Sequence, residues 1–82
     1  MKVIVFGSKH CKPCHTWKRM LKEAGIEFEY VDVEKDPQQA NAFLVTSLPT
    51  TIVYNPEIGA VMAFEVGTSR KFLKWLKEAL NG

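Results

Sequence analysis

Residues 3–14 read VIVFGSKHCKPC. Residues 3–6 are uniformly apolar, as in a central strand of a sheet that is covered on both faces. A short polar turn follows, and the two cysteines of the chain, Cys11 and Cys14, stand three positions apart. This spacing predicts two thiols within disulfide reach at the start of a helix, where a dithiol is both reactive and easily reoxidised.

The size and charge of the chain narrow the classes of function. The 82 residues, 46% of them hydrophobic, suffice for one compact core, so we expect a single domain over residues 1–82. The net charge of +2 is spread along the chain, which argues against partners such as nucleic acid or an anionic membrane. No apolar run approaches the roughly 20 residues of a membrane span, and we see no secretory signal. We therefore expect a cytoplasmic protein, in which a cysteine pair is more often catalytic or metal-binding than a permanent crosslink.

Hydrophobic periodicity and turn signals predict an alternation of strands and helices. Strands are expected over residues 2–6, 26–33, 50–54 and 60–66, and helices over residues 13–24, 37–44 and from residue 70 to just before Gly82. A helical crossover should join the first two strands in parallel, and the turn-rich residues 55–59 should join the last two as a hairpin. The predicted fold class is α/β, in the order β-α-β-α-β-β-α, with a four-stranded mixed sheet flanked by helices.

The chemistry of the motif assigns different roles to the two thiols. At the helix start, the Cys11 sulfur faces unpaired backbone N–H groups and the positive end of the helix dipole, which lower the pKa of its thiol. His10 and Lys12 add positive charge, and Pro13 stiffens the turn at little cost. Cys14 lies one turn further and should stay a thiol until a substrate sulfur has bonded to Cys11. Cys11 is thus the expected nucleophile and Cys14 the resolving cysteine.

Two other uses of the same residues remain open. A zinc ion or iron–sulfur cluster could be held by His10, Cys11, Cys14 and His15, which would make the protein a non-enzymatic metal-binding module. Four ligands within six residues surround a tetrahedral ion poorly, so we favour a redox dithiol with no bound metal. Residues 11–15 also match the CxxCH string of covalent haem attachment, which is at odds with the absence of an export signal.

The combination of these motifs resembles the thioredoxin and glutaredoxin superfamily over essentially the whole chain. The resemblance is carried by the Cys-x-x-Cys motif after the first strand, by Leu48-Pro49-Thr50 at the start of the third, and by Val66-Gly67 before the last helix. It implies a thioredoxin-like fold and a cis peptide bond at Pro49, which would lie against the dithiol. It also implies a substrate-binding surface formed by Leu48, Pro49, Thr50 and Gly67, where the backbone of Leu48 pairs with the substrate chain.

The chain combines features of both branches of that superfamily. Its length is that of a glutaredoxin, but it lacks the double glycine and following aspartate that hold glutathione, because Gly67 is followed by Thr68. It also differs from thioredoxin, which has a tryptophan at the position of His10 and a buried aspartate near Val5. Small glutaredoxin-sized, thioredoxin-like redoxins are similar, although the dithiol and C-terminal motifs typical of NrdH-redoxins are not reproduced.

The implied function is thiol–disulfide oxidoreductase activity by a monomer with a redox-active Cys11–Cys14 disulfide. Its substrates would be disulfide-containing proteins, with ribonucleotide reductase among the clients that the resemblance implies. Electrons are expected from NADPH through a thioredoxin reductase-like partner that carries the flavin. Glutathione-dependent glutaredoxin activity is the alternative.

Overall fold

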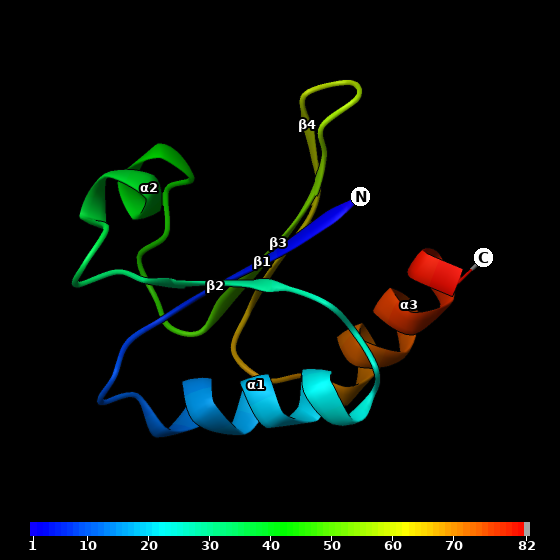
Figure 1. Cartoon of the computed structure of the whole chain (residues 1–82), viewed down its shortest axis with the longest axis horizontal. Helices are drawn as coiled ribbons and strands as arrows, with labels where there is room; N and C mark the ends of the chain where they lie inside the picture. Colours follow the sequence, from blue (N-terminus) through cyan, green and yellow to red (C-terminus); the bar gives the residue numbers. More distant parts are fainter. Residues whose placement is uncertain (82) are drawn as a thin grey trace.

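The computed structural model describes residues 1–81 and contains the elements in the expected order. The strands are β1 (Lys2–Gly7), β2 (Glu29–Asp32), β3 (Thr50–Asn55) and β4 (Ala60–Val66), and the helices are α1 (Lys12–Glu23), α2 (Pro37–Ala42) and α3 (Arg70–Asn81). Figure 1 shows their arrangement.

The four strands form one mixed sheet in the order β2-β1-β3-β4. β1 pairs in parallel with β2 and antiparallel with β3, and β3 pairs antiparallel with β4. α1 and α3 pack on one face of the sheet and α2 on the other (Figure 1). The structure thus confirms the predicted fold class, including the parallel crossover and the C-terminal hairpin.

The larger core lies between the sheet and the helices α1 and α3. It is formed by buried side chains from both layers: Val3, Val5, Trp17, Leu21, Ile26, Val53 and Leu76. Trp17 is fully buried, and its indole N–H donates a hydrogen bond of 2.6 Å to Oγ1 of Thr51, which is also fully buried. Trp17 therefore joins α1 to β3 both by packing and by a specific polar contact.

The smaller core lies on the α2 face. Ile4, Phe6 and Ile52 from the sheet pack against Ala40 of α2. Asp36 caps this helix, because its Oδ1 accepts the backbone N–H of Gln39 at 3.2 Å. The cap and the apolar contacts fix a helix that is too short to be stable by itself.

The sequence prediction extended α2 too far, to residue 44. The helix ends at Ala42, because Leu44 takes a left-handed conformation with φ of 59°. The N–H groups of Leu44 and Val45 donate to the carbonyls of Asn41 and Ala40 and so close the helix end. Leu44 stands where a glycine is usual, and this is why no stop signal is visible there in the sequence.

The second strand is also shorter than predicted, starting at Glu29 rather than at Ile26. Gly25, at φ of 73°, ends α1 in a left-handed conformation, and the N–H of Ile26 then donates to the carbonyl of Leu21. Ile26 is therefore part of the helix cap, although its side chain is buried in the core. The β-branched and aromatic pattern of residues 26–28 reflects this burial rather than strand pairing.

Within residues 1–81, no helix combines the length and the apolar character needed to cross a membrane.

Replacing Thr51 by valine should destabilise the fold, because the buried Trp17 N–H would lose its acceptor while the shape of the side chain is kept. We expect the free energy of unfolding to fall by about 1–3 kcal/mol, as measured by urea denaturation. Thr51→Ser, which retains the hydroxyl, should recover most of this loss, and Thr46→Val at an exposed position serves as the control. Equal stability of Thr51→Val and the wild type would show that the hydrogen bond contributes nothing.

Candidate active site

The register of the sheet brings the predicted site residues together at one end of the strands. Val31, Phe6, Thr50 and Val66 form one row across the four strands. Beyond this row lie the loop that follows β1 and leads to the cysteines, the proline that precedes β3, and the glycine that follows β4. Segments far apart in the sequence therefore meet at the end of the sheet where α1 begins.

The two cysteines are joined in a disulfide, with their Cα atoms 5.2 Å apart. Cys11 is the N-cap residue of α1, and its Sγ accepts the backbone N–H of Cys14 at 3.1 Å. Cys11 is partly exposed, whereas the exposed fraction of Cys14 is 0%. The helix start thus provides a hydrogen-bond donor for the Cys11 sulfur, and it leaves Cys11 partly exposed while Cys14 is enclosed.

The other residues of the active-site turn lie at the surface. His10, Lys12 and Pro13 are exposed, and Pro13 is in the first turn of α1. The carbonyl of Ser8, earlier in the loop, accepts the N–H of Cys11 at 3.4 Å. These side chains therefore lie at the surface beside the partly exposed Cys11.

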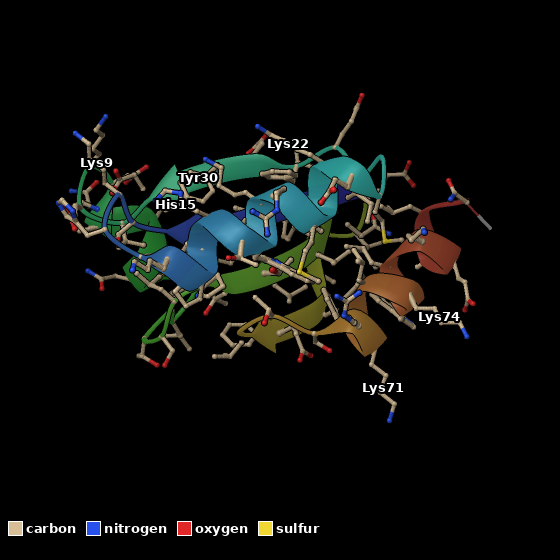
Figure 2. The ribbon with its side chains drawn as sticks, turned by 90° about the horizontal axis from the view of Figure 1, so that it is seen from below. Lys9, His15, Lys22, Tyr30, Lys71 and Lys74 are labelled. Atoms are coloured by element: carbon tan, nitrogen blue, oxygen red, sulfur yellow. A yellow bond between two sulfur atoms is a disulfide. The ribbon has the colours of Figure 1, made fainter. Side chains whose placement is uncertain are left out.

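Two side chains that the sequence analysis did not place in the redox site hold the loop before Cys11. The Tyr30 hydroxyl donates to the carbonyl of Ser8 at 3.3 Å, and Nε2 of His15 is 2.8 Å from the carbonyl oxygen of Lys9. Figure 2 labels both residues, together with Lys9 of the loop. His15, considered above as a metal ligand, is instead engaged with the backbone of the loop.

Gly7 is the sequence signal that could have pointed to Tyr30. A β-carbon at Gly7 would overlap the Tyr30 hydroxyl and would lie 3.0 Å from Cβ of Cys14. A glycine at a strand end directly before a reactive motif often marks such a close approach. The sequence does not say which side chain makes the approach, since Tyr30 is 23 positions further along the chain.

The environment of Tyr30 keeps its phenol protonated. Burial raises the pKa of Tyr30, and the negative charge of Asp32 raises it further. The ammonium group of Lys18 lies over the ring, 4.0 Å from its centroid. Tyr30 is thus a fixed hydrogen-bond donor at neutral pH.

The proline loop is tied to the turn after β4. The Leu48–Pro49 peptide bond is cis, as the resemblance implied, and Pro49 is fully buried. The N–H of Gly67 donates to the carbonyl of Pro49 at 2.7 Å, and the Thr50 hydroxyl donates to the carbonyl of Ser47 at 2.6 Å. Three of the predicted substrate-binding residues, Pro49, Thr50 and Gly67, are thereby fixed in one cluster, with Leu48 next to it in the chain.

The alternative metal site is not assembled in residues 1–81. No group of three histidine, cysteine or carboxylate side chains in this part of the chain is placed to hold a metal ion. Both thiols are consumed in the disulfide.

A thioredoxin-like sheet with a dithiol at the start of the first helix and a cis-proline before the third strand defines the class of small redoxins. Comparison with known proteins places the chain within this class. The family model described as Glutaredoxin matches residues 3–51, which is more than half of the chain. The chain therefore belongs to the glutaredoxin family.

Individual relatives come from both branches of the superfamily. The chain is 30% identical to the SPbeta prophage-derived thioredoxin-like protein YosR of Bacillus subtilis, over 94% of this chain and all of YosR. It is 31% identical to the glutaredoxin-like protein NrdH of Escherichia coli, over 51% of this chain and 52% of NrdH. The solved structure of that NrdH-redoxin covers 93% of this chain and 95% of its own, with a TM-score of 0.75 at 24% identity.

A solved thioredoxin structure has a similar TM-score to this chain. The oxidised thioredoxin of Plasmodium falciparum superposes with a TM-score of 0.80 at 25% identity, covering 98% of this chain and 80% of its own. These neighbours confirm the thioredoxin-like fold that the sequence predicts.

The unequal exposure of the two sulfurs predicts which thiol is modified first after reduction. One equivalent of an alkylating agent at neutral pH should label Cys11, since Cys14 is enclosed. Peptide mapping by mass spectrometry measures the ratio, with Cys11→Ser as the control in which the remaining thiol reacts slowly. Faster labelling of Cys14 would contradict the placement of the two sulfurs.

Proposed function

We propose that this thiol–disulfide oxidoreductase is a reductase of protein disulfides, with Cys11 as the nucleophile and Cys14 as the resolving cysteine. The observation that carries the proposal is the Cys11–Cys14 disulfide at the N-terminus of α1, with Cys11 partly exposed and Cys14 buried. Membership in the glutaredoxin family supports the chemistry in general.

The reaction follows from this geometry. In the reduced protein, the Cys11 thiolate attacks one sulfur of the substrate disulfide, and the other substrate sulfur leaves with the electron pair and takes up a proton. Cys14 then attacks the Cys11 sulfur, so that the Cys11–Cys14 bond forms and the second substrate thiol is released. The N–H of Cys14, which lies 3.1 Å from the Cys11 sulfur, can stabilise the charge on Cys11 in the reduced state.

The proline loop is the proposed docking surface for the substrate chain. The N–H of Gly67 is bound to the carbonyl of Pro49. Among the backbone hydrogen bonds that lie outside helices and strands in residues 1–81, none uses the N–H or the carbonyl of Leu48. An extended substrate segment can pair with these two groups of Leu48 and bring its disulfide to Cys11. This mode reads the backbone of the substrate and accepts many protein sequences.

A reductase fed by NADPH is the proposed electron donor, in preference to glutathione. The segment after Gly67 has no carboxylate that could hold the amino group of glutathione, because Thr68, Ser69 and Arg70 follow. The Ser69 hydroxyl accepts the N–H of Phe72 at 3.0 Å and so serves the start of α3. The flavin of such a reductase belongs to the partner, and this protein needs no bound cofactor beyond its disulfide.

The proposed setting is that of a cytoplasmic, single-domain monomer. The similarity to glutaredoxin-like NrdH supports ribonucleotide reductase as a client of the kind that the resemblance to small redoxins implies. The thioredoxin-like name of YosR agrees with protein disulfides as substrates.

The first test of this function is reduction of insulin disulfides with dithiothreitol as the electron source. The wild type should accelerate the reaction and Cys11→Ser should abolish the acceleration, since the attacking sulfur is gone. Reduced Cys14→Ser, freed of dithiothreitol before insulin is added, should form a mixed disulfide with the substrate that persists, as seen on a non-reducing gel. Equal rates for the wild type and Cys11→Ser would refute the proposed function.

The electron donor is tested by an exchange of the residues after Gly67. Wild-type protein should be reduced by thioredoxin reductase with NADPH, and its rate with glutathione should rise linearly without saturation. Thr68→Gly combined with Ser69→Asp creates the double glycine and aspartate of glutaredoxins and should introduce saturation by glutathione. Ser69→Asp alone, which keeps a helix-capping residue, is the matched control. Saturable glutathione-dependent activity of the wild type would contradict the proposed donor.

A further inference from the structure

The resolving cysteine is in an environment that disfavours its reactive form. Cys14 is fully buried, and burial of a thiol away from water disfavours the thiolate that must attack the mixed disulfide. Val5, near the position where thioredoxin has a buried aspartate, is itself fully buried in the apolar core. The preceding strand therefore offers Cys14 no carboxyl group.

A hydroxyl group lies beside Cys14 instead. Tyr30 reaches from β2 into the space that a side chain on Gly7 would fill, and the same space borders Cβ of Cys14. The Tyr30 phenol and the Cys14 side chain thus both lie next to the α-carbon of Gly7.

The hydrogen bond that the Tyr30 hydroxyl makes in the oxidised protein is long. This bond to the Ser8 carbonyl is 3.3 Å long, beyond the roughly 2.5–3.0 Å usual for O–H···O contacts, and is therefore weak. Lys18 of α1 holds the ring in place from its face. Burial, together with Asp32 on the same strand, raises the pKa of Tyr30, so the phenol acts as a donor and not as a base.

We propose that Tyr30 donates a hydrogen bond to Sγ of Cys14 when the disulfide is open, exchanging the Ser8 carbonyl for the sulfur. Its effect on turnover rests on the proposed function. The Cys14 thiol gives up one proton, balanced by the proton that the departing substrate sulfur takes up, and the thiolate attacks the Cys11 sulfur of the mixed disulfide. The Cys11–Cys14 bond forms, the bond from Cys11 to the substrate breaks, and the substrate sulfur leaves with the electron pair and is protonated. Tyr30 keeps its own proton throughout and stabilises the attacking charge.

The test is Tyr30→Phe, which keeps the ring and removes the hydroxyl. In a Cys11→Ser background, the thiolate absorbance of Cys14 should titrate at higher pH than with Tyr30 present. Resolution of a preformed mixed disulfide on Cys11, with both cysteines present, should slow about tenfold or more, because a hydrogen bond to a charged group is lost. Tyr54→Phe removes the other tyrosine hydroxyl and should change neither quantity.

A second measurement keeps the test decisive if Tyr30→Phe folds poorly. In Tyr54→Phe protein, Tyr30 is the sole tyrosine and can be replaced by fluorotyrosine, whose more acidic phenol is a stronger donor. The Cys14 titration should then move to lower pH. No movement with either replacement would overturn the proposal.

Tyr30→Phe also distinguishes a hydrogen bond to Cys14 from a purely structural role in which Tyr30 only holds the loop. If Tyr30 acts only by holding the Ser8 carbonyl, Tyr30→Phe should alter the titration of Cys11, measured in a Cys14→Ser background, and leave that of Cys14 unchanged; this outcome would also overturn the proposal. The titrations involve no substrate, so their result stands apart from any failure to reduce insulin.

Discussion

The pairing of β1 with both of its neighbours is the constraint on which the site depends. β1 is the only strand of the described sheet that joins a parallel partner, β2, to an antiparallel one, β3. This register brings the end of β1, the start of β3 and the end of β4 to the same end of the sheet. A change of register by one residue would invert the faces of the strand and separate the cysteine loop from the proline loop. The redox site is therefore a product of the sheet as a whole.

The contrast between the two sulfurs arises from the same arrangement. Because α1 begins only a few residues after β1, its first turn lies over the end of the sheet, and Cys14 points into the interior while Cys11 caps the helix. Trp17, one turn further, anchors the helix through its bond to Thr51 beside Pro49 and Thr50. A single helix thus orients the dithiol and is itself fixed to the strand that carries the proline loop.

Much of this could be predicted from the sequence because the signals are local. Apolar runs, the Asp36-Pro37 helix start and the spacing of Cys11 and Cys14 each depend on a few adjacent residues. The C-terminal end of α2 and the start of β2 were predicted wrongly because tertiary contacts override the pattern there, as Leu44 in a left-handed conformation shows. The contacts of Tyr30 and His15 with the loop were missed for a different reason. They join side chains to backbone carbonyls, and no periodicity records which carbonyl is near which side chain.

The match to the Glutaredoxin family model is confined to one part of the chain. The Glutaredoxin match covers residues 3–51, the segment from β1 to the first residues of β3 that builds the dithiol and the proline loop. The resemblance places the groups that hold glutathione in glutaredoxins beyond this segment, after β4. There, the N–H of Gly67 is bound to Pro49 and the Ser69 hydroxyl to the backbone of α3, so both serve the fold. The proposed function accordingly assigns recognition of the substrate to backbone pairing at the proline loop, and not to polar groups after β4. Under that proposal, the residues around the dithiol set the specificity, whereas the dithiol itself determines only that disulfides are exchanged.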